Sequence, residues 1–123
     1  MSFTSLSYTS KATDDLTVDK LKEIIHTASI FNNEHNITGH LCVLEKKGRI
    51  DSFSQWIEGK TRDIEECYSR IEAASSHTNL VLIYRGAPEA RLYKDWSLQF
   101  ETMNSIDVKM FMNTMKLPVV NTV

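Results

Sequence analysis

The sequence predicts an α+β fold of the ferredoxin-like class, with its elements in the order β-α-β-β-α-β-β. Two observations support this class. Several short segments alternate apolar and polar residues with the period of two that is typical of strands. Two longer segments between them repeat apolar residues every three to four positions, as amphipathic helices do. A mixed five-stranded sheet with both helices on one face would bury these apolar faces together, so we expect that arrangement.

The first strand is predicted over residues 3–9 and the first helix over residues 17–31. Tyr8 falls on the buried face of the strand, so its side chain is expected to point inward. Thr17 is suited to cap the helix. The helix carries an apolar stripe of Leu21, Ile24, Ile25, Ala28 and Phe31. Asn32 continues this stripe, where an amide needs hydrogen-bond partners.

A hairpin and a second helix follow. The two strands of the hairpin are predicted over residues 37–44 and 50–58, and its tip over residues 46–49. Gln55 places a second amide on an otherwise apolar strand face. The second helix is predicted over residues 61–74, with an apolar stripe of Ile64, Cys67, Tyr68, Ile71 and Ala74.

The third part of the chain begins with the apolar run 80–84, which predicts a central strand covered on both faces. The last strand is predicted over residues 92–100, with Trp96 and Leu98 on its inward face. Ser105 can cap a short C-terminal helix, whose apolar stripe consists of Val108, Phe111, Met112 and Met115. We expect this stripe to pack within the chain, to form a homodimer contact, or to link the domain to an effector.

The composition excludes several classes of protein. The chain has 123 residues and a net charge of −2, so it lacks the basic excess of a nucleic-acid-binding protein. It contains no apolar run long enough to cross a membrane and no secretory signal, so we expect a cytoplasmic protein. The two cysteines and four histidines show no metal-ligand spacing, so no metal is expected.

Three polar residues on apolar faces are candidates for a binding site: Tyr8, Asn32 and Gln55. Amides of this kind are commonly no more than hydrogen-bonded core residues. Together, however, they form a polar centre between the first helix and the sheet, suited to a flat ligand with carbonyls and ring nitrogens. A glutamine suits this role because its amide both donates and accepts hydrogen bonds.

Several motifs carry a family resemblance. Residues 32–39 read NNEHNITG, residues 53–59 read FSQWIEG and residues 95–98 read DWSL, and Tyr8 stands in the first strand. In this order they resemble the BLUF domain, a blue-light sensor that uses FAD. The resemblance covers about residues 3 to 100.

The resemblance implies roles for individual residues. Tyr8 corresponds to the photoactive tyrosine of the family, and Gln55 to the glutamine between this phenol and the flavin. Asn32 would bind the edge of the flavin ring, with Asn33 as the alternative. The other implied flavin-binding residues are Ile24, Ile25, Ala28, Ile64, Cys67, Ile71 and His77. The flavin tail would be held by groups such as Lys60, Arg62 or Arg70.

The resemblance also implies a light-driven rearrangement rather than enzymatic turnover. In the family, the excited flavin takes an electron from the tyrosine, a proton follows through the glutamine, and the glutamine ends rotated or tautomerised. The signal would leave through the last strand, at Trp96 and at Leu98, where the family commonly has methionine.

We therefore expect a sensor domain over residues 1–100, followed by a C-terminal helix and tail over residues 101–123. Flavin and a second copy of the chain are the expected partners. A fused or associated effector, such as an adenylyl cyclase or a phosphodiesterase, would provide the output. The alternative is a ferredoxin-like protein-interaction domain without a chromophore. A small hydrolase such as an acylphosphatase would need a glycine-rich phosphate loop, which is missing.

Overall fold

The computed structural model describes residues 2–101, and for residues 97–101 it describes the backbone alone. The elements follow the predicted order, and the α+β class is confirmed. They are β1 (Phe3–Ala12), α1 (Val18–Glu34), β2 (Thr38–Lys46), β3 (Arg49–Lys60), α2 (Thr61–Ala73), β4 (His77–Gly86) and β5 (Trp96–Glu101). The predicted C-terminal helix and the side chain of Leu98 lie outside the described residues.

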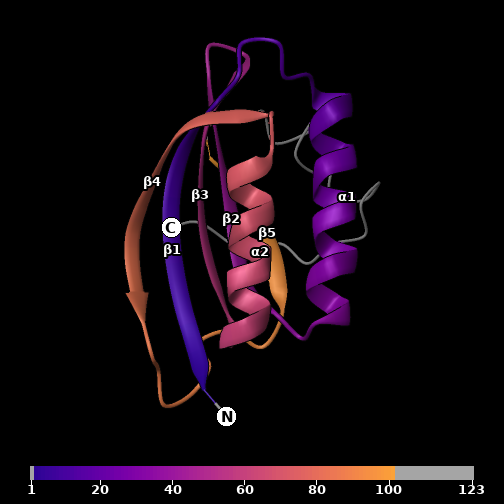
Figure 1. Cartoon of the computed structure of the whole chain (residues 1–123). Helices are drawn as coiled ribbons and strands as arrows, with labels where there is room; N and C mark the ends of the chain where they lie inside the picture. The colour runs from indigo at the N-terminus through magenta and orange to yellow at the C-terminus, as the bar shows by residue number, and fades with distance from the viewer. Residues whose placement is uncertain (1, 102–123) are drawn as a thin grey trace.

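The strands form one sheet in the order β4-β1-β3-β2-β5. All neighbours pair antiparallel except β2 and β5, which are parallel. Both helices lie on the same face of the sheet, as predicted (Figure 1). In this order β1 and β3 are adjacent near the middle, and the residues they project toward the helices become direct neighbours.

Local signals in the sequence set the bounds of α1, whereas the start of α2 is marked by a contact with β1. The Thr17 side chain accepts a hydrogen bond from the Lys20 amide over 3.1 Å and so caps α1 as predicted. Asn36, in the left-handed region at φ 56°, reverses the chain after α1 so that β2 can begin. α2 starts directly at the end of β3, where the Thr4 and Thr61 hydroxyls are hydrogen-bonded at 2.7 Å.

The core consists of two clusters of buried side chains. One lies mainly under α1 and contains Leu21, Ile25, Leu41, Val43, Phe53 and Trp96. The other extends under α2 and contains Leu6, Tyr8, Phe31, Ile37, Ile57, Ile64 and Cys67. Side chains from both clusters meet between the helices, and this is where the candidate site lies.

The prediction that residues 80–84 form a central strand was wrong. β4 lies at the edge of the sheet, and Val81, Leu82, Ile83 and Tyr84 are each between 46% and 60% exposed. Two register shifts between β1 and β4 interrupt the regular alternation of its side chains. A continuous apolar run reports hydrophobicity and not the position of the strand in the sheet.

The last strand also differs from the prediction, because β5 begins at Trp96 rather than at Leu92. Leu92 is 71% exposed. The residues around it belong to a connecting segment held by polar contacts with β2 and β3. Within the described residues, no helix is long and apolar enough to cross a membrane.

Candidate flavin site

A cavity of about 380 Å³ lies between α1 and α2, over the central strands. This volume falls within the range of about 300–1,000 Å³ that is usual for small-molecule sites. Its walls are mostly apolar, with polar side chains from both helices and from β1, β3 and β4. The predicted flavin-binding residues that line it are Tyr8, Ile24, Ile25, Ala28, Asn32, Gln55, Cys67, Ile71 and His77.

Tyr8 and Gln55 form a hydrogen bond in the wall of this cavity. The two residues are directly paired between β1 and β3, and the Tyr8 hydroxyl donates to Gln55 Oε1 over 3.2 Å. Their side chains are 4% and 6% exposed. Burial, and to a lesser extent the nearby Cys67 and Tyr68, raise the pKa of the Tyr8 phenol above its usual range. The phenol therefore keeps its proton and acts as a donor.

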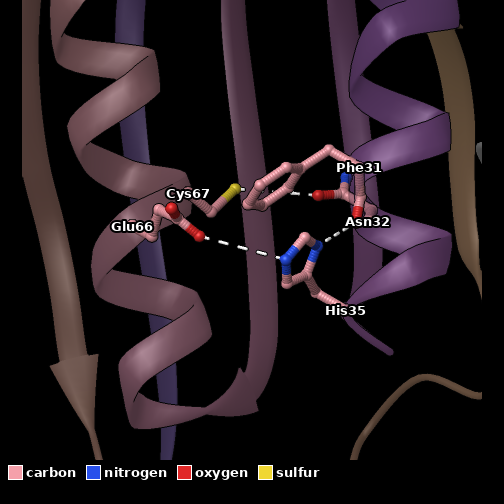
Figure 2. A network of polar contacts seen from close by, with 5 residues as sticks. All are labelled: Phe31, Asn32, His35, Glu66 and Cys67. Atoms are coloured by element: carbon pink, nitrogen blue, oxygen red, sulfur yellow. Dashed lines mark hydrogen bonds and ion pairs between the residues drawn. The ribbon is translucent and has the colours of Figure 1, made fainter.

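Asn32 is held from across the cavity by Cys67. The Cys67 thiol on α2 donates to Asn32 Oδ1 on α1 over 3.7 Å, and both side chains are buried (Figure 2). Burial raises the pKa of the Cys67 thiol to about 12, so the sulfur is a protonated donor at neutral pH. With its oxygen engaged, the Asn32 amide can direct its NH₂ group to an acceptor on a ligand. Asn33, the alternative, is exposed.

His35 joins the same two helices at one end of the site. Its Nδ1 donates to the Phe31 carbonyl over 2.8 Å, and its Nε2 lies 3.9 Å from Glu66 Oε2 on α2 (Figure 2). The His35 ring stacks on the Phe31 ring, with centroids 4.0 Å apart. The Arg70 guanidinium lies 4.3 Å from the centroid of the Phe31 ring. Phe31 therefore has a fixed position in the cavity wall.

His77 lines the cavity where α2, β1 and β4 meet. Its Nε2 donates to the Ile71 carbonyl over 2.7 Å, because a carbonyl can only accept. In the neutral ring, Nδ1 then accepts from the Ser10 hydroxyl, also at 2.7 Å. Both ring nitrogens are thus used to join three elements, and His77 offers a ligand its ring rather than a free polar atom.

Ile64, predicted to contact the flavin ring, is placed elsewhere by the structure. It is fully buried in the core cluster under α2 and does not line the cavity. Its side chain packs beside Gly59 at the end of β3. Ile64 supports the site from below, while Cys67 and Ile71 on the same helix line it.

Several lining residues were not predicted as flavin-binding. Phe31 and Leu21 belong to the predicted apolar stripe of the first helix, so the sequence contained a signal for them. Trp96, predicted only for signalling, also lines the cavity and is 8% exposed. Lys20 was not predicted either and adds a cation to the lining. Of the three cations predicted for the flavin tail, Arg70 lines the cavity, whereas Lys60 and Arg62 do not. Nothing local in the sequence distinguishes Lys20 from other exposed lysines.

The chemistry of the cavity fits a flat aromatic ligand. Apolar side chains from both helices can contact the two faces of a ring, and the Asn32 and Gln55 amides can pair with polar atoms at its edge. The buried phenol of Tyr8 supplies an oxidisable group hydrogen-bonded to one of these amides. The described residues hold no group of histidine, cysteine and acidic side chains suited to a metal ion.

Comparisons with known proteins identify the family. Residues 3–99 match the family described as sensors of blue light using FAD, or BLUF. Photoactivated adenylate cyclase subunit beta of Euglena gracilis is 29% identical over 111 residues, which are 89% of this chain and 12% of that protein. The chain therefore spans only a small part of its curated relative.

Solved structures agree with this match. The dark-state structure of BlrB, a BLUF protein, superposes with a TM-score of 0.71 and 25% identity, covering 80% of this chain and 71% of that chain. A bacterial light-regulated adenylyl cyclase shares the fold, with a TM-score of 0.70 and 21% identity over 93% of this chain and 33% of that chain. Because the family match covers most of its length, the chain belongs to the BLUF family of blue-light sensors that use FAD.

Proposed function

We propose that this chain binds FAD non-covalently in the cavity between α1 and α2 and works as a blue-light switch. The observation that carries this proposal is the buried hydrogen bond from the Tyr8 hydroxyl to Gln55 Oε1, which lies in the wall of the cavity. It places an oxidisable phenol next to an amide that can exchange its donor and acceptor ends.

In this proposal, the ring lies between the apolar side chains of the two helices, chiefly Ile24, Ile25 and Ala28 on α1 and Cys67 and Ile71 on α2. The Asn32 NH₂ group donates to a carbonyl at the edge of the ring, with the amide oriented by Cys67. Lys20 and Arg70, in the lining of the same cavity, supply positive charge for the phosphates of the tail.

When bound and excited by blue light, the flavin supplies a strong one-electron acceptor. Tyr8 would be the electron donor, and the acidity of the oxidised phenol would drive its proton along the existing hydrogen bond to Gln55 Oε1. The return of the electron and the proton leaves Gln55 rotated or tautomerised, so that its amide presents a different polar end. Because Tyr8 and Gln55 are both buried, water would compete little for these hydrogen bonds and the exchange would persist.

The signal leaves, in our proposal, through Trp96 and Leu98 on β5. Trp96 is in the cavity wall, and the backbone of Leu98 pairs with Leu41 on β2. Residues 1–100 would form the sensor, and residues 101–123 would connect it to an output. An adenylyl cyclase is the output we propose first, because that activity is named in the relatives. A homodimer and a cytoplasmic location remain predictions.

An absorption spectrum tests the proposal directly. The purified chain, reconstituted with FAD, should be yellow, shift its absorbance to longer wavelength under blue light and recover in darkness. Parallel reconstitution with FMN and riboflavin identifies the form that is bound. A chain that stays colourless and gains no thermal stability with any flavin would overturn the proposal, since a ligand of the folded state must stabilise it. That result would favour the chromophore-free interaction domain.

A further inference from the structure

Glu58 is a buried carboxylate on the face of the sheet opposite the cavity. Along β3, Gln55 and Ile57 face the helices, whereas Trp56 and Glu58 face the other way. Glu58 is nevertheless fully buried. Burying a carboxylate is costly unless hydrogen bonds compensate it, so its contacts call for an explanation.

The carboxylate joins β3 to the segment between β4 and β5. One oxygen, Oε1, accepts the Trp56 indole N–H over 3.1 Å, and the other, Oε2, accepts the Tyr93 backbone N–H over 2.7 Å. Arg91 adds a bond from its Nη1 to the Glu58 carbonyl over 3.1 Å and one to the Thr38 hydroxyl over 2.7 Å. We call these five residues the Glu58 clasp.

In the sequence, Tyr93 of the clasp lies shortly before Trp96, whose side chain lines the cavity. Two residues after Tyr93, the Asp95 carbonyl accepts the Gly39 N–H over 3.1 Å, and Trp96 follows with its ring in the cavity wall. Among the described residues, the buried Trp96 Nε1 has no hydrogen-bond partner. Side-chain packing and the position of the backbone therefore hold the ring, and the clasp fixes that backbone.

We propose that Glu58 is a positioning residue of the switch, an inference that rests on the proposed function. It holds the Tyr93–Trp96 segment against the strand that carries Gln55, and so keeps the Trp96 ring closed over the cavity. Loosening this segment would admit water near Gln55. Water can relay protons and compete for hydrogen bonds, so the light-induced arrangement at Gln55 would decay faster.

The test compares Glu58→Gln with Glu89→Gln, a matched substitution at an exposed position of the same segment. A glutamine can accept at only one end, so one of the two N–H groups facing position 58 loses its acceptor. We expect dark recovery of the FAD-loaded chain to be about tenfold faster, the ratio that corresponds to one charge-assisted hydrogen bond. Glu89→Gln should recover at the wild-type rate.

A second readout follows Trp96 itself. The chain has two tryptophans, and a Trp96→Phe variant, which keeps all the hydrogen bonds of the clasp, assigns their indole signals in a ¹⁵N–¹H spectrum. In Glu58→Gln, the Trp96 indole N–H should shift and exchange faster with solvent, with or without flavin. An unchanged recovery rate together with an unmoved Trp96 signal would overturn the proposal.

If Glu58→Gln does not fold, the Arg91→Met variant tests the role of the clasp instead. It removes the two Arg91 bonds of the clasp and keeps the aliphatic stem, and it should also speed recovery. A wild-type rate in Arg91→Met would then count against the clasp. If the wild-type chain showed no light response, the proposed function would fail. The Trp96 signal of the flavin-free protein would still test the positioning role separately.

Discussion

The Tyr8 hydroxyl donates to Gln55 Oε1 over 3.2 Å between two residues that are directly paired on neighbouring strands. The register of β1 and β3, and not a loop, therefore sets the separation of the two groups. Regular strands hold functional groups more precisely than loops do, because their backbone hydrogen bonds fix each position. The pair that we propose as light-sensitive thus lies where two strands pair without a register shift.

Replacing Tyr8 by phenylalanine removes the donor and the oxidisable phenol from this pair. We expect Tyr8→Phe to bind FAD and to show no red shift under blue light. The unpaired Gln55 oxygen should lower the free energy of unfolding of the flavin-free chain by about 1–3 kcal/mol. Absorbance spectra and denaturant titrations measure both effects. Tyr68→Phe, which changes a ring 6.1 Å from Tyr8, is the control and should keep the red shift. A full shift in Tyr8→Phe would remove the assigned role.

The Cys67 thiol should be protected from alkylation near neutral pH. It is 6% exposed and its pKa is raised to about 12, so little reactive thiolate is present. Between pH of about 7 and 9, its reaction with iodoacetamide should become about tenfold faster per pH unit, because the thiolate fraction rises about tenfold per pH unit. Bound FAD should slow it further. Peptide mapping by mass spectrometry separates Cys67 from the half-buried Cys42, and equal labelling of the two at neutral pH would contradict the prediction.

Gly39 and Gly48 should respond very differently to alanine. Gly39 has φ 146°, and a Cβ there would overlap the Trp56 carbonyl oxygen of the neighbouring strand. We expect Gly39→Ala to cost at least about 3 kcal/mol, because backbone atoms would have to move. Gly48 has φ 74° in an open turn, so Gly48→Ala should cost only about 1–2 kcal/mol. Thermal or denaturant unfolding of the pair measures this contrast, and similar losses would refute it.

The His40 ring should make stability depend on pH. Burial lowers its pKa below the usual 6.5, and its Nδ1 has no hydrogen-bond partner among the described residues. Below pH 6.5 the unfolded chain therefore binds a proton at His40 that the folded chain does not. The free energy of unfolding should fall as the pH drops from 6.5 toward the lowered pKa, and be fully retained above 6.5. His40→Phe should reduce this slope, and an identical slope would exclude His40 as its source.

The sequence alone predicted the parts of the structure that depend on local pattern. The stripe of α1 and the inward positions of Tyr8 and Gln55 follow from periodicity, and the cap at Thr17 follows from its residue type; the structure has all of them. Ile64 lies on the predicted helix face, but periodicity gives the direction of a side chain and not the depth at which it packs.

Contacts between distant segments could not be predicted in this way. Alternation along β3 places Glu58 on the face away from the helices, where a carboxylate is normally solvated. The segment before β5 covers it, and only the assembled sheet brings Tyr93 and Glu58 together. The edge position of β4 was missed for the same reason, because strand order is decided by long-range pairing.

The order of the strands has a consequence for how a signal can pass from the site to other proteins or domains. β1 and β3, which carry Tyr8 and Gln55, are neighbours, and each has a different strand on its other side: β4 beside β1, and β2 followed by β5 beside β3. The pair that we propose as the photochemical trigger therefore lies between the two edges of the sheet, not at one of them. A change in this pair would reach the β4 edge directly from β1 and the β5 edge through β2, so a module attached after β5 and a protein resting on β4 would share one trigger.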